Sequence, residues 1–446
     1  MKKLGLMLLV SLFAVSLSAC AGVTEVEEDP LVCDSGWSDV DGVCVEDEEL
    51  PEPVVVLPSQ GVTDTTVTVG NSAVASGFLA FVGVPFNQGI NAYFDMVNDA
   101  GGVAGRTIEF IEYDDEFNAA SGITYAEKLL NDDEVFAFVG HFGTPTVSAT
   151  LETLKDAGIP QVYYATGISA LFNENATGTD KSSFPVQPIY DAEGQVMVAR
   201  AIGEFGATKI GVIYTNDDAG MGISMGVRIQ ARIEGITLVE AQVAGDAVDM
   251  TAAAATIMAG DVDIVIVAAN QIPAEVAIKA LSAAGNTSDV LVSYVNAAPT
   301  FIANIAAELV NFDVYANAWL ELFEEDGVTF SSAYDEYILE ISKVDPALAG
   351  NPYAMAGWIA AAFFVVGLER VGTDVLTWDN YIDAMEESPV LNPFGGTVDY
   401  ADGRRAGTQS MSLLLATVIP AEGDNPESYV FAPFRPLETI NSILED

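Results

Sequence analysis

The chain has 446 residues, half of them hydrophobic, and its 65 acidic residues outnumber its 16 basic residues to give a formal net charge of −49. This length exceeds one compact core, so we expect two lobes with ample apolar material to bury. The negative charge disfavours binding to nucleic acid and to anionic lipid surfaces. It bears on solubility and on a salty habitat rather than on the fold.

Residues 1–19 have the three parts of a lipoprotein signal peptide. Lys2 and Lys3 form the charged start, and "LGLMLLVSLFAVSL" is an apolar core too short for a stop-transfer helix. The segment "LSAC" ends at Cys20 and resembles the lipobox of bacterial lipoproteins. That resemblance implies cleavage before Cys20 and acylation of this residue, with two or more chains giving stable anchoring. An uncleaved anchor helix is the alternative.

Residues 20–60 are acidic and contain prolines, as in "EVEEDP" and "EDEELPEP". Such a tract buries little apolar area, so we expect a self-repelling tether. Cys33 and Cys44 form an even pair that indicates a disulfide outside the cytoplasm. The aspartates between them do not match the ligand spacing of a calcium loop, and we expect neither a metal nor a cofactor.

After Gly61 the chain alternates β-type and helix-type runs, which predicts an α/β fold with parallel strands and helices on both faces. The first series is "TTVTVG", "RTIEFIEY", "VFAFVG" and "IPQVYYA", and the second is "KIGVIYT", "ITLVEAQV", "VDIVIVAA" and "VLVSYV". The segment "FPVQPIYDAEGQ", 184–195, separates them. The later apolar run at 355–368 is short enough to indicate a buried helix.

Ligands of such sheets bind at the carboxyl ends of strands, where loops lead into helices. Four loops stand at these positions: "GHFGTPT", "ATGIS", "TNDDAGMG" and "SYVNAAP". In the first, Thr144 can cap a helix and Pro145 suits its first turn. The N–H groups of Thr146 and Val147 then become donors for a carboxylate, although plain helix capping explains the same residues.

The sequence does not match the common catalytic and nucleotide-binding motifs. His141 is the single histidine, has no nucleophile motif beside it, and indicates a residue packed near the loop. "GMGISMG", 220–226, has its third glycine one position late for a dinucleotide motif, and no P-loop pattern occurs. We therefore do not expect an enzyme.

Several segments together resemble the extracytoplasmic solute-binding proteins of the leucine/isoleucine/valine-binding type, which serve ABC importers. They are "VNDAGGVAGRTIEFIEYDD", "AEKLLNDDEVFAFVGHFGTPT", "AGIPQVYYATG", "FPVQPIYDAEGQ", "KIGVIYTNDDAGMG" and "GWIAAAFFVVGLERVG". The resemblance implies a type I periplasmic binding protein fold, with two Rossmann-like lobes joined by three hinge crossings. It implies lobe 1 at 61–187 and 316–400, and lobe 2 at 188–315 and 401–446.

The resemblance also implies binding residues in lobe 1. Thr144 takes the place of the hydroxyl that holds the ligand carboxylate, and Phe142 lies in the same loop. Ala165 and Gly167 align with the backbone groups of the next loop, with the Thr166 hydroxyl between them. An aromatic position near the first loop corresponds to Phe81 or Val82. The ligand-binding residues that the resemblance implies in lobe 1 are thus Phe81, Phe142, Thr144, Ala165, Thr166 and Gly167.

Lobe 2 departs from the family pattern. A family tyrosine is replaced by Ala219, and the acid that meets the ligand ammonium falls at or beside Val295, next to the neutral Asn296. An unpaired ammonium in a closed cleft costs several kcal/mol, so we do not expect an α-amino acid unless Asp218 replaces the charge. The remaining candidates are Asn296 and either Asn270 or Gln271, with Tyr164, Tyr190 and Tyr294 as ligand-contacting or lobe-packing residues.

We therefore expect a lipid-anchored extracytoplasmic receptor for a small solute, amino-acid-like or carboxylate-bearing. Its implied partners are the permease and ATPase subunits of an ABC importer, and its contact with the membrane is through the N-terminal lipid alone. The alternative is a ligand-sensing ectodomain of the same fold coupled to a signalling partner.

Overall fold

The computed structural model describes residues 32–33, 37–40, 43–46, 56–322, 330–423 and 426–445. The chain divides into two compact units, one up to Val55 and one from Val56 onward. The predicted signal peptide and Cys20, the predicted site of acylation, lie outside the described residues.

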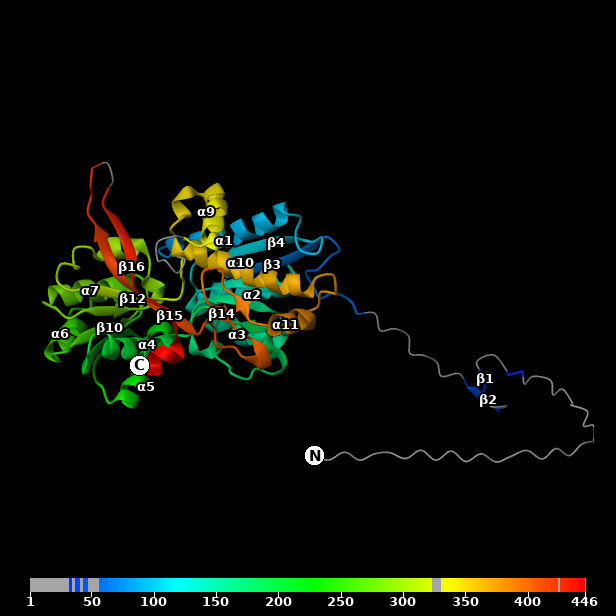
Figure 1. Ribbon diagram of the computed structural model, residues 1–446, viewed down its shortest axis with the longest axis horizontal. Helices are drawn as coiled ribbons and strands as arrows, with labels where there is room; N and C mark the ends of the chain where they lie inside the picture. Colours follow the sequence, from blue (N-terminus) through cyan, green and yellow to red (C-terminus); the bar gives the residue numbers. More distant parts are fainter. Residues whose placement is uncertain are drawn as a thin grey trace, which may run out of the picture. The chain divides into compact units, whose positions relative to one another are not determined.

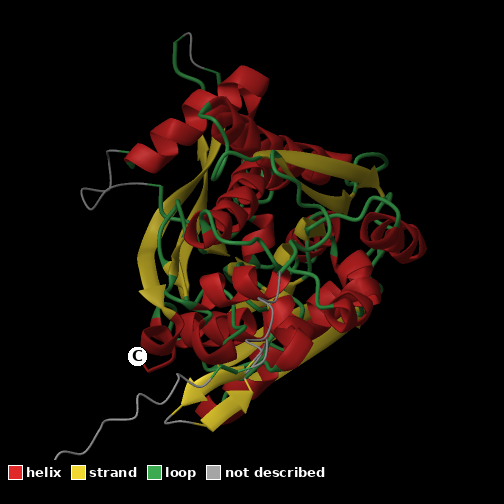
Figure 2. Cartoon of the chain, turned by 90° about the vertical axis from the view of Figure 1, so that its right-hand side faces the viewer, coloured by secondary structure: helices red, strands yellow, loops and turns green. Residues whose placement is uncertain are grey.

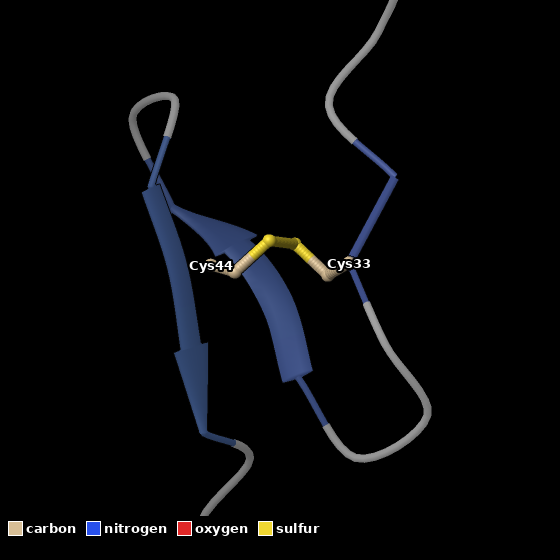
Figure 3. Close-up of a disulfide and its surroundings, with 2 residues drawn as sticks. All are labelled: Cys33 and Cys44. Carbon is tan, nitrogen blue, oxygen red and sulfur yellow. A yellow bond between two sulfur atoms is a disulfide. The ribbon is translucent and has the colours of Figure 1, made fainter.

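The first unit contains a small antiparallel hairpin. Strand β1 (Trp37–Val40) pairs with β2 (Val43–Glu46), and a disulfide joins Cys33 to Cys44 with 5.5 Å between their Cα atoms (Figure 3). This is the pairing that the sequence predicts. Trp37 and Val45 remain exposed, so apolar burial contributes little here. The disulfide is the main constraint, as is common in small secreted modules.

The second unit contains two large sheets and a two-stranded antiparallel one, formed by β13 (Val390–Leu391) and β14 (Thr397–Val398). The first has the order β4-β3-β5-β6-β7, and all its strands are parallel. Its strands are β3 (Thr66–Ala73), β4 (Thr107–Asp114), β5 (Ala137–Phe142), β6 (Gln161–Ala165) and β7 (Ser183–Phe184). Its helices are α1 (Ala80–Asp99), α2 (Ala119–Asn131), α3 (Thr144–Ala157), α9 (Ser332–Val344), α10 (Pro352–Val371) and α11 (Trp378–Glu386).

The second sheet has the order β9-β8-β10-β11-β12-β15-β16. Its parallel strands are β8 (Lys209–Thr215), β9 (Thr237–Val243), β10 (Ile264–Ala268), β11 (Val290–Val292) and β12 (Val314–Ala318). The antiparallel pair β15 (Ser410–Ile419) and β16 (Ser428–Thr439) extends it. Its helices are α4 (Tyr190–Gly203), α5 (Asp218–Glu234), α6 (Thr251–Ala259), α7 (Ile272–Ala283), α8 (Pro299–Ile305) and α12 (Ile440–Glu445).

Figures 1 and 2 show helices flanking both sheets, which confirms the predicted fold class of two Rossmann-like lobes with parallel strands. The chain passes between the sheets three times: after β7, after β12 and before β15. Strand β12 pairs within the second sheet to Ala318, beyond the expected boundary at 315. Arg405 still donates to Lys181 O and Glu386 Oε1 of lobe 1, so the last crossing falls after the expected residue 401.

Helix starts are fixed by residues that the sequence displays. The Asn118 side chain accepts from the N–H groups of Ala120 and Ser121, and Asn351 caps α10 in the same way. Among the described residues one helix, α10, is long and apolar enough to cross a membrane, but 78% of its most apolar stretch is buried. It is a core helix, as its length predicts.

Close helix packing holds lobe 1 together behind the cleft. A Cβ on Gly89 of α1 would lie 2.0 Å from Ala354 O of α10, and one on Gly357 would lie 1.8 Å from Phe86 O. The two glycines therefore allow the backbones of α1 and α10 to touch. This contact brings the starts of both helices to the same side of the lobe.

Candidate functional site

Two adjoining cavities lie between the lobes. The outer cavity has a volume of about 330 Å³ and the inner cavity about 360 Å³. Both are lined by Val82, Phe142, Ala165, Tyr190, Gln271 and Val295. The walls follow β3, β5, β8 and β10, where the strand order of each sheet reverses. This is the position at which doubly wound sheets bind ligands.

The start of α3 forms the lobe 1 wall of the outer cavity. Gly143, with φ of 90°, is the residue before the helix, and Thr144 is its first residue rather than its cap. Val147 N–H donates to Gly143 O at 2.9 Å, so the prediction that it is free was wrong. Within the described part of the chain, the N–H groups of Thr144 and Thr146 have no acceptor. Positive helix-dipole character therefore faces this region.

Hydroxyl and amide groups continue this wall. Thr144 Oγ1 lies 2.8 Å from Thr166 Oγ1, and Asn270 Nδ2 donates to the Tyr190 hydroxyl at 3.3 Å. Burial raises the pKa of Tyr190, which keeps its hydroxyl neutral. Asn270 Oδ1 is buried and has no donor in the described structure. A buried acceptor of this kind is satisfied by a ligand donor or by water.

The opposite wall is acidic. Asp217 caps α5 by accepting from Gly220 N–H at 2.9 Å, and Asp218 is the first residue of that helix. Asp218 Oδ2 also accepts from the Ser148 hydroxyl of α3 at 2.7 Å, a hydrogen bond that joins the two lobes across the mouth. The outer cavity thus has donors on one side and carboxylates on the other.

The inner cavity differs in chemistry. Among the described residues that line it none is charged, and most are apolar or aromatic. Phe86 comes from α1, Trp319 from the crossing after β12, Met355 from α10, and Phe431 from β16. Both lobes and one crossing therefore enclose it.

Strained backbone lies in both cavities. Tyr163 has φ of 64° and Gln271 has φ of 47°, values that non-glycine residues seldom adopt. The pairing of β5 with β6 omits Gly140 and Tyr163, and the Tyr163 ring lines the inner cavity. Its hydroxyl donates to Gln187 Oε1 at 3.1 Å. Strain of this kind is found at functional sites.

The structure brings six of the candidate residues together in the cavity walls: Phe142, Thr144, Ala165, Tyr190, Asp218 and Gln271. Tyr294, the third tyrosine considered, lines the inner cavity. Thr166 is buried behind Thr144. Val82 and Asn270, the named alternatives to Phe81 and Gln271, also line the outer cavity, and the other candidates lie elsewhere.

Phe81 is 43% exposed and lies edge-on to Tyr353, while its neighbour Val82 lines both cavities. Tyr164 is in the core, where its hydroxyl donates to Ser183. Gly167 packs so closely on Pro188 O that a Cβ would lie 2.4 Å away. We therefore leave these three residues out of the candidate site.

Asn296 is also left out, because its amide is already used. Its Oδ1 accepts from Gln271 N–H at 2.6 Å and its Nδ2 donates to Ala269 O at 2.9 Å. It holds the strained loop after β10. Val295 faces both cavities in its place, so this part of the wall is apolar, as the missing family acid indicates.

His141 is buried and does not line either cavity. Its Nε2 lies 2.9 Å from Thr150 Oγ1, and burial lowers its pKa to about 3, so the ring is neutral. This is the packed residue that the sequence predicts. Among the described residues no group of three His, Cys, Asp or Glu side chains could hold a metal ion.

Sequence reasoning missed most of the inner cavity. Four of its lining residues lie outside the loops that follow parallel strands. Trp319 lies in the crossing after β12, Tyr353 in the first turn of α10, Leu414 on β15 and Phe431 on β16. A search restricted to loops after parallel strands does not reach them. The cap at Asn351 was the one local signal for the nearby start of α10.

Two parallel α/β lobes thus line cavities at their switch points, the position at which doubly wound folds bind ligands. A family model described as periplasmic binding protein matches residues 66–419, and the chain belongs to this family. This is a family of binding proteins rather than enzymes.

Individual relatives agree with this assignment. An amino acid binding protein of Pseudomonas aeruginosa is 26% identical over 179 residues, which cover 38% of this chain and 44% of that protein. The match thus spans less than half of that relative.

Solved structures share the fold. A fatty acid ABC transporter substrate-binding protein from Thermomonospora curvata has a TM-score of 0.72 at 20% identity, covering 88% of this chain and 97% of its own. A branched-chain amino acid ABC transporter protein from Thermus thermophilus with bound valine gives 0.70 at 16% identity, covering 86% and 99%. A solute-binding protein from Rhodopseudomonas palustris with p-hydroxybenzoic acid gives 0.69 at 18%, covering 84% and 97%.

Proposed function

We propose that this protein captures a small carboxylate-bearing solute between its lobes and delivers it to an ABC importer. The carboxylate binds in the outer cavity at Thr144 and the unpaired N–H groups that begin α3. A helix start of this kind favours a negative group. The observation on which the proposal rests is the Thr144 hydroxyl and unpaired N–H at the cavity wall, with the unpaired N–H of the buried Thr146 two residues further along the helix.

The same head group carries a hydrogen-bond donor. Asn270 Oδ1 is buried without a partner, and Asp217 and Asp218 line the wall opposite α3. An amine or hydroxyl beside the carboxylate satisfies these acceptors, so the solute is amino-acid-like in this respect. The ligands named for the three solved relatives are a fatty acid, valine and p-hydroxybenzoic acid, all of which bear a carboxylate.

A ligand that contacts both walls favours the closed state and raises the melting temperature by mass action. The test is a thermal-shift and calorimetric screen of the purified protein against carboxylates, their amides, and carboxylates with 2-amino or 2-hydroxy groups. We expect shifts for carboxylates and none for the matched amides. Equal shifts for acids and amides, or no shift with any carboxylate, would overturn the proposal.

Attachment to the membrane through acylated Cys20 is part of the same proposal. Its support is the charged start, apolar core and "LSAC" segment of the sequence. Mass spectrometry of the N-terminal peptide tests this: we expect the wild-type protein to begin at Cys20 and to carry the mass of its acyl chains, and Cys20→Ser to lack them. A wild-type protein that keeps residues 1–19, or that has an unmodified Cys20, would contradict the lipid anchor.

A further inference from the structure

The inner cavity has no role in holding a small charged head group. Among its described lining residues none is charged, and its polar atoms belong mainly to tyrosines and to Gln187 and Gln271. Tyr163 already donates to Gln187, and the Gln271 side chain bonds to the Tyr353 hydroxyl. An apolar space whose polar groups are paired offers water few hydrogen bonds. It therefore suits an apolar occupant.

The inner cavity adjoins the outer one. Of the six shared lining residues four, Val82, Phe142, Ala165 and Val295, are apolar. Beyond these residues the wall continues to Leu414 of β15 and to Phe431 of β16. A solute held by its head in the outer cavity can therefore extend an unbranched chain inward.

Exposed apolar side chains also lie at the outer cavity, beside the polar Ser148–Asp218 contact. Phe78 is 68% exposed and Ile272 is 37% exposed, and both line the outer cavity. They come from different lobes, just before α1 and at the start of α7. Exposed apolar side chains at a cavity entrance mark a site for apolar ligands.

We infer that the solute is an amphipathic acid whose medium-length apolar chain fills the inner cavity. This inference rests on the proposed function, because the carboxylate end remains at Thr144 and α3. The cavity selects solutes by chain length. Each methylene group that enters it is removed from water, whereas a methylene group for which the cavity has no room stays in water.

The test is calorimetric titration of the full chain with two matched series below their micelle concentrations. The first contains butanoate, hexanoate, octanoate and decanoate, and the second contains the corresponding 2-amino acids. Affinity is expected to rise about fourfold per methylene until the cavity is full, with an increasingly negative heat-capacity change. The difference in affinity between the two series measures the contribution of the 2-amino group. The change in affinity per methylene within each series measures the contribution of the apolar chain of the solute.

Two variants locate the apolar chain of the solute. Ala356 of α10 lines the inner cavity but not the outer one, and Ala356→Phe shortens the space available to that chain. We expect decanoate binding to weaken about fifteenfold, the value of two methylenes, while butanoate binding stays unchanged. Phe431→Ala enlarges the far end, so the preferred chain becomes longer. Val366→Phe, a partly buried position on α10 outside the cavity, is the matched control.

The outcomes separate the two claims. If short and long carboxylates bind with equal affinity, or if Ala356→Phe and Val366→Phe change the affinity for decanoate equally, the inference of an apolar chain in the inner cavity is excluded while the proposed function stands. If no carboxylate of either series binds, the inference falls, and the proposed function falls with it only if the wider carboxylate screen is also negative. Unfolding curves of each variant identify any loss of binding that comes from misfolding.

Discussion

Thr144 combines three properties that a carboxylate site needs. It begins α3, its N–H has no acceptor in the described part of the protein, and its hydroxyl lies 2.8 Å from that of Thr166. The Thr166 hydroxyl can donate to Thr144, which leaves the Thr144 proton free for a ligand. The pair therefore acts as a relay of hydrogen bonds from the core to the cavity.

Thr144→Val keeps the shape of this side chain and removes its hydroxyl. A hydrogen bond to a charged group contributes about 1.5–3 kcal/mol, so we expect the affinity for the best carboxylate to fall about ten- to a hundredfold. Calorimetric titration measures this. Thr153→Val, an exposed position on the same helix, is the control. An unchanged dissociation constant for Thr144→Val would remove this residue from the site.

Individual residues also set the limit of sequence reasoning. Tyr163 and Tyr164 are adjacent and chemically identical, yet one lines the inner cavity and the other is bonded to Ser183 in the core. The choice depends on the irregular pairing between β5 and β6, where Tyr163 adopts φ of 64°. No local pattern in "IPQVYYA" reports that irregularity.

At the scale of elements, a buried carboxylate joins α4 to the loop that lines the cavities. Glu193 accepts from Ser293 Oγ and Tyr294 N–H, each at 2.8 Å, and from Asn317 Nδ2 at 3.4 Å. Burial raises the pKa of Glu193 to about 7, although the three hydrogen bonds act in the opposite direction. The residue thus positions Tyr294 and Val295 without contacting the solute.

This raised pKa predicts a pH-dependent stability. Between about pH 4.5 and 7 the folded state keeps the Glu193 proton while the unfolded state releases it. Stability from this residue is therefore full below pH 4.5 and is lost as the pH rises to about 7, by on the order of a few kcal/mol.

Glu193→Gln cannot release a proton, so the difference in unfolding free energy between variant and wild type should change across this window. Urea unfolding at several pH values measures it, with the exposed Glu152→Gln as the control. A difference that stays constant with pH would show that Glu193 is ionised throughout.

The elements themselves were largely predictable, because alternating strand and helix patterns are local. The four loops after β5, β6, β8 and β11 were identified as ligand-facing, and each contributes residues to the cavities. The inner cavity was not predictable in the same way. Its walls combine α1, α10 and β16, and α1 and α10 are brought together by the close packing of Gly89 on Ala354 and of Gly357 on Phe86.

At the scale of the whole molecule, the net charge of −49 opposes compactness. Like charges within a folded chain repel, and salt shortens the range of that repulsion from about 10 Å at 0.1 M to about 3 Å at 1 M. The favourable ion pairs are fewer than the acids, since the chain has 16 basic residues against 65 acidic ones. Screening by salt therefore weakens the repulsion between acidic residues more than it weakens the attraction within the ion pairs.

We expect the melting temperature to rise by several degrees between 0.1 M and 1 M sodium chloride. Differential scanning calorimetry measures this, and a neutral osmolyte at equal osmolality separates screening from general exclusion effects. A melting temperature that is flat or falls with salt would mean that ion pairs outweigh the repulsion between acids.

The central claim is that two lobes close around a carboxylate-bearing solute, with Ser148 and Asp218 meeting across the mouth. Spin labels at the exposed positions Glu152→Cys on α3 and Met225→Cys on α5, in a chain carrying Cys20→Ser, report this movement by pulsed electron resonance. Saturation with the tightest carboxylate of the screen should replace a broad distribution of longer distances by a narrow, shorter one. An identical distribution with and without that bound carboxylate would contradict closure.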